Sequence, residues 1–142
     1  MRILGIDYGD SRVGLAISDA LGITANGIST VSIRNNFNNA ISEIANVCNE
    51  YGVETLVIGY PKNMDGTLGF RVQATEKFIT ALMEKLSNCS REMNIVRWDE
   101  RLTTIQAQKT MRAVGVNTRK KGKGMVDKIA AEIILQGYLD SL

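Results

Sequence analysis

Four acidic residues stand where an apolar run of the sequence ends or where an apolar helix is expected to begin. Asp7 follows "RILGI", Asp99 and Glu100 follow "NIVRW", and Asp127 precedes "KIAAEIIL". A carboxylate at the end of a buried strand costs free energy unless a partner neutralises it. In an open α/β sheet, strand ends and helix starts on one edge converge on a common crevice. The sequence therefore predicts that these acids meet.

The chain of 142 residues contains no histidine. This excludes Ser-His-Asp and Cys-His catalysis, histidine general-base chemistry and histidine-ligated zinc. Two or three convergent carboxylates instead form an oxygen-rich site suited to Mg²⁺ or Mn²⁺. Such a site supports two-metal phosphoryl chemistry, in which a water is activated and the leaving oxygen is stabilised.

Each acid also has a purely structural interpretation. Asp7 could accept backbone N–H groups in the turn "DYGD". Glu100 could pair with Arg97 or Arg101 on the surface, and Asp127 could complement a helix dipole. The catalytic interpretation depends on the coincidence of these acids with a basic segment in a chain that lacks histidine.

Three glycines near the first acid do not form a phosphate-binding loop. Gly5, Gly9 and Gly14 lack the GxGxxG spacing, and no helix is expected directly after them. We expect Gly9 at a hairpin tip, and Gly14 at a place of close packing or close backbone approach.

Positive charge is concentrated in one segment. Residues 112–128 carry six basic residues against one acid, whereas the other 11 basic residues face 14 acids. A local cluster on a nearly neutral protein indicates a polyanion footprint, although a solvated loop is the alternative. The lysines of "NTRKKGKG" would make salt-dependent, sequence-independent contacts with phosphates.

The expected elements must position the acids and the basic segment. Apolar patterns and turn residues predict strands at 2–8, 12–18, 24–33, 54–61 and 92–100, and helices at 36–52, with Gly52 as the stop, and at 70–86, 103–115 and 125–142. The order βββαβαβαα predicts a mixed five-stranded sheet with helices on both faces, an arrangement found in the ribonuclease H-like fold. The length predicts a single domain, residues 1–142.

Composition adds a prediction of location. No apolar stretch reaches the roughly 18 residues that a membrane span needs, and no signal-peptide pattern precedes the first strand, so we expect a cytoplasmic protein. Cys48 and Cys89 have no CxxC spacing and are expected to be reduced thiols.

Four blocks of the sequence together resemble one known family. "GIDYGDSRVGLAISD", "VIGYPKNMDGT", "WDERLTT" and "VDKIAAEIILQGYL" occur in the order typical of the YqgF family, which comprises Holliday-junction-resolvase-like proteins and pre-16S ribosomal RNA nucleases. The resemblance covers essentially the whole chain. It implies a ribonuclease H-like fold related to the RuvC resolvases, with an acidic active site that depends on Mg²⁺ or Mn²⁺.

By the same resemblance, Asp7 is the metal ligand of the first strand, and Asp127 is the acid of the last helix. Glu100 is the second acidic position, with Asp99 next to it. Successive strand residues point to opposite faces, so one of Asp99 and Glu100 enters the site, and we favour Glu100. The acid that RuvC-type resolvases carry at the end of the fourth strand is absent from "VIGYP". This favours general phosphodiester hydrolysis over junction resolution.

Nucleic-acid contacts are expected from two segments. In "PKNMDGTLG", Lys62 and Asn63 would contact phosphate, unless this loop is only an ordered turn fixed by Pro61 and Gly66. The remaining predicted contacts are basic residues between the fifth strand and the last helix: Arg101, Arg119, Lys120, Lys121 and Lys123.

The function predicted from the sequence is metal-dependent hydrolysis of phosphodiesters, with the 5′ end of pre-16S ribosomal RNA as the substrate. One alternative is resolution of branched DNA, which would favour a homodimer over a monomer. Others are a nucleic-acid-binding module without catalysis, and a phosphate-binding lobe like that of the sugar kinases, which would need a second lobe to enclose ATP.

Overall fold

The computed structural model describes residues 2–9, 11–34, 36–60, 69–87, 93–99 and 123–142. Of Phe70 and of residues 123–127 it describes the backbone. The helix expected at 103–115 lies outside the described residues.

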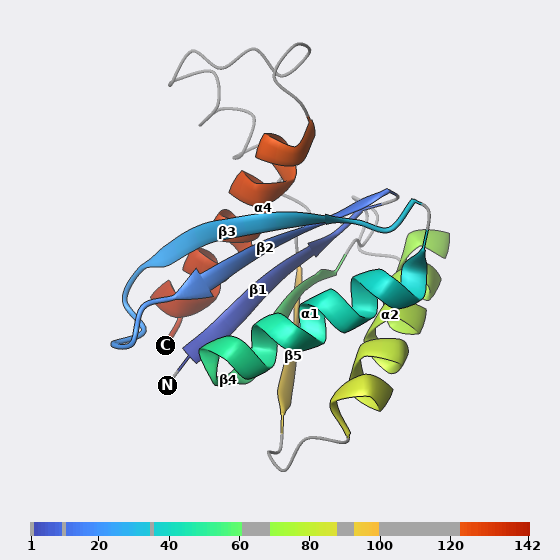
Figure 1. Ribbon diagram of the computed structural model, residues 1–142. Helices are drawn as coiled ribbons and strands as arrows, with labels where there is room; N and C mark the ends of the chain where they lie inside the picture. Colours follow the sequence, from blue (N-terminus) through green and yellow to red (C-terminus); the bar gives the residue numbers. More distant parts are fainter. Residues whose placement is uncertain (1, 10, 35, 61–68, 88–92, 100–122) are drawn as a thin grey trace.

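Five strands form one mixed sheet in the order β3-β2-β1-β4-β5 (Figure 1). Strand β2 is antiparallel to β1 and to β3, whereas β4 is parallel to both β1 and β5. The carboxyl ends of β1, β3, β4 and β5 therefore lie at one edge of the sheet, here called the carboxyl edge. The strands are β1 (Arg2–Tyr8), β2 (Arg12–Ser18), β3 (Ala25–Ser32), β4 (Val53–Tyr60) and β5 (Asn94–Asp99).

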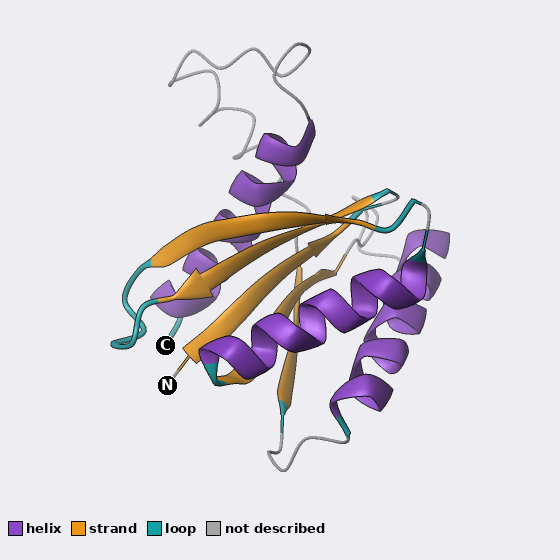
Figure 2. Cartoon of the chain, viewed as in Figure 1, coloured by secondary structure: helices purple, strands orange, loops and turns teal. Residues whose placement is uncertain are grey.

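Helices cover both faces of this sheet (Figure 2). Helices α1 (Phe37–Tyr51) and α2 (Phe70–Leu86) lie on one face, and α4 (Lys123–Asp140) lies on the other. We call these faces the α1–α2 face and the α4 face. The mixed five-stranded sheet with helices on both faces, predicted from the element order, is confirmed. None of the helices in the described part of the chain is long and apolar enough to cross a membrane.

The larger core lies on the α1–α2 face. Alternate residues of β1 and β4, among them Leu4, Ile6 and Ile58, are buried there against the two helices. Helix α1 begins at the Asn36 cap, whose side chain accepts from the N–H of Asn39, and ends at Gly52, which adopts the left-handed conformation. Glycine adopts this conformation without strain, so the predicted stop at Gly52 is confirmed.

The second core lies under α4. It combines Ile3, Ala16 and Val57 of the sheet with Ala131 and Leu135 of the helix. Gly5 lets the helix approach closely, because a Cβ there would lie 2.7 Å from Leu135 Cβ and 3.0 Å from the Ala131 carbonyl oxygen. Gly5, two residues before Asp7 on β1, is thus a place of close packing between strand and helix, and the close approach expected at Gly14 stays a prediction.

Helix α4 runs antiparallel to β3, and therefore to β1. Its Gln136 side chain accepts from the N–H of Ala25 at 3.0 Å, and its Glu132 side chain accepts from the N–H of Gly27 at 2.5 Å. Residue numbers thus fall along α4 as they rise along β3. The amino-terminal turns of α4 consequently lie toward the carboxyl edge.

Candidate active site

Asp7 lies on the α4 face at the carboxyl edge. Residues of β1 alternate between the two cores, with Leu4 and Ile6 on the α1–α2 face and Ile3 under α4. By this alternation Asp7 shares the α4 face with Ile3 and Gly5. Asp7 is half-buried, and it takes part in an interaction within the chain.

The backbone of Asp127 reaches the same edge on the same face. Asp127 is one helical turn before Ala131, which contacts Gly5. One turn corresponds to about 6 Å along α4, and the two residues from Gly5 to Asp7 correspond to about 7 Å along β1. Because the helix and the strand are antiparallel, both displacements are toward the carboxyl edge. The structure thus brings two of the predicted acids to one end of the α4 face.

Asp7 is flanked by buried glycines on both neighbouring strands. Gly14 of β2 is its direct partner in the antiparallel register. Gly59 of β4 follows Ile58, the partner of Ile6, and so stands beside Asp7 on the other side. Neither glycine carries a side chain that could cover the carboxylate on the α4 face.

Asp99 lies on the opposite face of the sheet. It is paired with Tyr60 in the parallel register of β4 and β5. Along β5, Val96 and Trp98 pack under α4, whereas Ile95 packs in the core beneath α1 and α2. By this alternation Asp99 is on the α1–α2 face, away from Asp7. The structure therefore separates Asp99 from the other two acids.

A hydrogen-bonded group occupies the α1–α2 face beside Asp99. The Tyr60 hydroxyl donates to Glu76 Oε1 at 2.8 Å. The Arg97 guanidinium donates to both Glu76 oxygens, from Nε at 2.7 Å and from Nη2 at 3.1 Å. Arg97 of β5 thus pairs with Glu76 of α2, whereas the surface pair with Glu100 considered from the sequence involves a residue outside the described ranges. No spacing in the sequence signals this contact between a helix and a strand.

This group shifts the titration of its members. Hydrogen bonds from Arg97 and Tyr60 lower the pKa of the Glu76 carboxyl below its ordinary value. Desolvation and the bond to Glu76 raise the pKa of the Tyr60 hydroxyl. Tyr60 directly precedes the segment "PKNMDGTL", so the group fixes the point at which the chain leaves β4.

The lowered pKa of Glu76 predicts a pH dependence of stability. A carboxyl with a depressed folded-state pKa contributes stability above its unfolded-state pKa, and this contribution is lost as pH falls through the folded-state pKa. Glu76→Gln should therefore lower the free energy of unfolding at pH 7 by up to about 1 kcal/mol. The effect is this small because the Glu76 side chain is 38% exposed and solvent screens the pair. At pH 3 the loss should be smaller, because protonation of the wild-type carboxyl has already weakened the pair. Urea unfolding at both pH values measures this. An equal loss at both would contradict it.

Several predicted site residues lie outside the described residues. These are Glu100, Lys62, Asn63, Arg101, Arg119, Lys120 and Lys121. Of Asp127 and Lys123 the backbone is described, as part of α4. Within the described ranges, no group of three or more acidic, cysteine or histidine side chains could hold a metal ion. Of the four predicted acids, Asp7 and Asp99 have side chains within the described residues.

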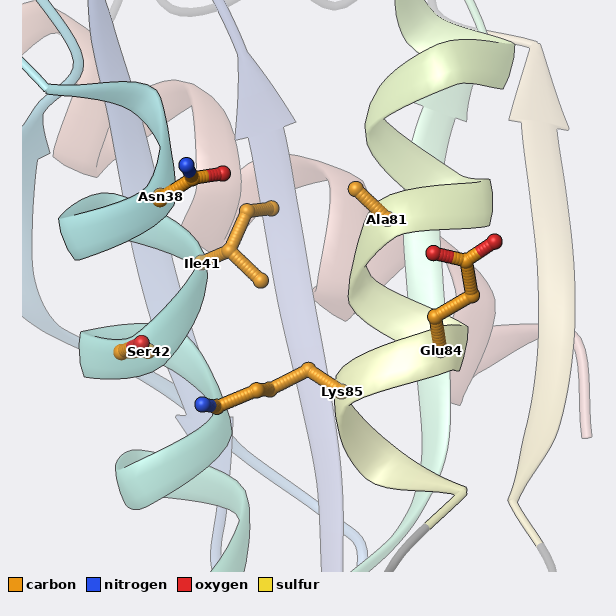
Figure 3. Close-up of a pocket in the computed structure, with 6 residues that line it drawn as sticks. All are labelled: Asn38, Ile41, Ser42, Ala81, Glu84 and Lys85. Carbon is orange, nitrogen blue, oxygen red and sulfur yellow. The ribbon is translucent and has the colours of Figure 1, made fainter.

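A shallow pocket of about 330 Å³ lies between α1 and α2 (Figure 3). The Lys85 side chain extends from α2 toward Ser42 of α1, whereas the Glu84 carboxylate points away from α1. The pocket opens on the α1–α2 face and is therefore separated from Asp7 by the sheet. Its residues are not among the predicted site residues.

Solved structures with similar folds define the class of protein. The fowlpox virus resolvase, solved with substrate Holliday junction DNA, matches 99% of this chain and 98% of its own with a TM-score of 0.57 and 17% identity. Thermus thermophilus RuvC, in complex with a Holliday junction substrate, matches 94% of this chain and 91% of its own with a TM-score of 0.55 and 11% identity. The fold is thus the ribonuclease H-like fold of the RuvC-like resolvases, as predicted.

The family follows from sequence similarity. A family model described as "RuvX: Holliday junction resolvase" matches residues 1–141. A protein from Clostridium tetani is 51% identical over 142 residues, covering 100% of this chain and 98% of the relative. One from Acetivibrio thermocellus is 49% identical over 141 residues, covering 99% and 96%. Both are named "Putative pre-16S rRNA nuclease". The chain belongs to the RuvX (YqgF) family, and its activity class is that of a nuclease.

Proposed function

We propose that the chain is a cytoplasmic, divalent-metal-dependent nuclease, formed by one ribonuclease H-like domain over residues 1–142, that processes the 5′ end of pre-16S ribosomal RNA. The observation that carries the proposal is the position of Asp7. It is a half-buried carboxylate between two buried glycines at the carboxyl edge, with the backbone of Asp127 at the same end of the same face. The names of the relatives support the RNA substrate.

The donors available at this edge fit Mg²⁺ or Mn²⁺. Carboxylate oxygens are the ligands that these ions prefer, and the chain has no histidine that would favour zinc. Two such ions, when bound, activate a water and stabilise the leaving oxygen of a phosphodiester. Asp7 and Asp127 would hold them from β1 and α4.

Glu100 is the proposed third ligand, and Asp99 is not. Asp99 is on the α1–α2 face with Tyr60 and Arg97, so its carboxylate is separated from Asp7 by the sheet. The ends of β1 and β5 are two strand spacings apart, about 10 Å. We expect Asp7 and Glu100 to ligate the same ions across this distance, because the glutamate side chain is longer than that of aspartate. Gly59 of β4, which stands beside Asp7, has no side chain to fill the space above it.

The chain's own residues bind and orient the substrate. Basic residues would neutralise phosphates on either side of the scissile bond: Lys62, Arg101, Arg119, Lys120, Lys121 and Lys123, with Asn63 as a neutral donor. Lysine and arginine nearest to Asp7 would stabilise the extra negative charge of the transition state. Most of this attraction is independent of sequence and weakens with salt.

Branched DNA is the second candidate substrate. The description of the matching family model favours it. The sequence of β4, however, ends in Gly59 and Tyr60, which gives no carboxylate at the place where RuvC-type resolvases are expected to have one.

Cleavage of two labelled substrates side by side tests the proposal. A precursor 5′ segment of small-subunit ribosomal RNA and a four-way DNA junction would be incubated with the protein in Mn²⁺ and in EDTA. We expect cleavage of the RNA in Mn²⁺, and none in EDTA. Preferred cleavage of the junction would replace the RNA substrate with branched DNA. Binding of RNA without cleavage in either condition would favour a non-catalytic module.

A further inference from the structure

The α4 face changes from apolar to polar at the row of Asp7. The two rows before it contain Ile3 and Gly5 of β1 with Ser18 and Ala16 of β2. Ile3 and Ala16 belong to the core under α4, and the buried Ser18 hydroxyl oxygen accepts from the N–H of Ile3 at 2.9 Å. In the row of Asp7, the register continues from Gly14 of β2 to Thr30 of β3. In the next row outward, Arg12 of β2 is paired with Ser32 of β3. The polar rows thus begin where the core under α4 ends.

Arg12 is a diagonal neighbour of Asp7 on this face. Asp7 is paired with Gly14, and Arg12 precedes Gly14 by two residues on the same strand. Diagonal neighbours on one face of a sheet have Cβ atoms roughly 7–8 Å apart, a distance that long side chains span. Gly14 contributes no side chain between them. A phosphate bound at Asp7 would therefore lie within reach of the Arg12 guanidinium.

The backbone that carries Arg12 is held in place by the hairpin. Its carbonyl accepts from the N–H of Gly9 at 2.9 Å, and a Cβ at Gly9 would lie 2.8 Å from that carbonyl oxygen. This confirms Gly9 as the hairpin-tip residue. Arg12 is half-buried, and it takes part in an interaction within the chain. A guanidinium has five N–H donors, so one that already has a partner still has donors for a ligand.

The residues around Arg12 are chemically suited to a phosphate. A guanidinium binds phosphate through two parallel hydrogen bonds. Thr30 and Ser32 each add a hydroxyl group, a type of group that donates to phosphate oxygens, and Thr30 also takes part in an interaction within the chain. The Ser32 hydroxyl oxygen accepts from the N–H of Arg34 at 3.4 Å, which leaves its hydrogen available for donation. All three side chains are on the α4 face, on the β3 side of Asp7.

We infer that Arg12, Thr30 and Ser32 form a phosphate subsite that holds the nucleotide next to the bond cleaved at Asp7. This inference rests on the proposed function, and it extends the substrate path. The strand would cross the carboxyl edge from β3, over Gly14 and Asp7, toward β4. The ligand class is the phosphodiester backbone of a single nucleic-acid strand. None of the residues expected from the sequence to bind nucleic acid belongs to this subsite.

Binding of a labelled, short single-stranded RNA tests the subsite without any cleavage. Affinity would be measured in EDTA across a range of KCl concentrations for the wild type and for Arg12→Gln, Arg12→Lys and Arg34→Gln. Arg34 is an exposed arginine at the same edge, so Arg34→Gln is the matched control for diffuse attraction. Thermal unfolding of each variant checks the fold.

We expect Arg12→Gln to weaken binding about 10-fold and to reduce the salt slope by about one. Arg12→Lys should retain the slope but bind several-fold more weakly than the wild type, because lysine cannot make the paired hydrogen bonds. Arg34→Gln should change the affinity by less than about twofold. Arg12→Lys keeps the charge and the aliphatic stem, so it serves the test even if Arg12→Gln does not fold.

Equal effects of Arg12→Gln and Arg34→Gln would overturn the subsite, as would wild-type affinity of Arg12→Lys. These outcomes leave the nuclease proposal intact, because cleavage and its loss in an Asp7 variant are measured separately. A second combination of results is also informative. If Arg12→Gln weakened RNA binding but an Asp7 variant cleaved at the wild-type rate, the subsite would be supported and the proposed metal site would be wrong.

Discussion

Asp7→Asn should lower metal-dependent cleavage of the preferred substrate by at least about 100-fold. Asparagine has the size of aspartate but no charge, so it weakens metal ligation while the strand end stays packed. Metal ions at such a site supply several kcal/mol of transition-state stabilisation, and each 1.36 kcal/mol corresponds to about tenfold in rate. Initial rates in Mn²⁺ at saturating substrate measure the effect.

Asp19→Asn is the matched control for this substitution. Asp19 is in the turn between β2 and β3, where its Oδ1 accepts from the N–H of Ile23 at 2.7 Å and of Thr24 at 3.3 Å. These hydrogen bonds lower the pKa of the Asp19 carboxyl. The turn is at the end of the sheet opposite to the carboxyl edge, so Asp19→Asn should retain cleavage.

The two variants together separate chemistry from folding. Loss of cleavage by Asp7→Asn alone, with an unchanged midpoint of thermal unfolding, places the chemistry at the carboxyl edge. Cleavage by Asp7→Asn at the wild-type rate would mean that Asp7 is a turn residue. In that case the proposed metal site would be wrong, whichever substrate the protein cleaves.

Gly5→Ala should destabilise the fold by about 1–3 kcal/mol and reduce cleavage as well. The added methyl group would lie 2.7 Å from Leu135 Cβ and 3.0 Å from the Ala131 carbonyl oxygen, so α4 must move away from β1. Overpacking of this kind costs more than the small gain from replacing glycine in a strand. Because Asp127 is one turn from Ala131, the same movement would displace the helical acid from Asp7.

Gly27→Ala provides the control at a second contact between the sheet and α4. A Cβ at Gly27 would meet the side chains of Lys128 and Glu132, at 2.5 Å and 2.8 Å. Both contacts are with side-chain atoms rather than helix backbone, so the Lys128 side chain can move aside and Glu132 can shift while it still accepts from the N–H of residue 27. We expect less than about 1 kcal/mol of destabilisation by urea unfolding, and wild-type cleavage. Destabilisation by Gly5→Ala of less than about 1 kcal/mol, as small as that expected for Gly27→Ala, would show that α4 accommodates a methyl group at Gly5.

The sequence by itself determined the order and the type of the described elements. The apolar runs of β1 and β4 and the 3.6-residue period of α1 each depend on neighbours along the chain. The helix predicted at 70–86 is confirmed as α2 (Phe70–Leu86), and Gly52 ends α1 as predicted. The fourth strand begins at Val53, one residue before the prediction, because Val53 is buried and paired with Arg2.

Only the tertiary structure decided which predicted residues share a face. Asp7 and Asp99 both end strands, and the sequence alone does not reveal that their carboxylates lie on opposite sides of the sheet. The face on which a strand residue lies depends on the strand register and on the core into which the residues next to it pack. On β5, Ile95 packs in the core beneath α1 and α2, and Trp98 packs under α4. These contacts join residues that are far apart in the chain.

The same reason explains the residues that the sequence did not reveal. Glu76 pairs with Arg97 across 21 positions, and Arg12 becomes a neighbour of Asp7 through the register of the hairpin. Helix α4 reaches the acidic end of the sheet because Gly5 lacks a side chain and Glu132 and Gln136 bind the backbone of β3. Residue types and local spacing determined the acids and the elements, whereas register, face and helix direction, which arise from long-range packing, decided how the candidate site is assembled.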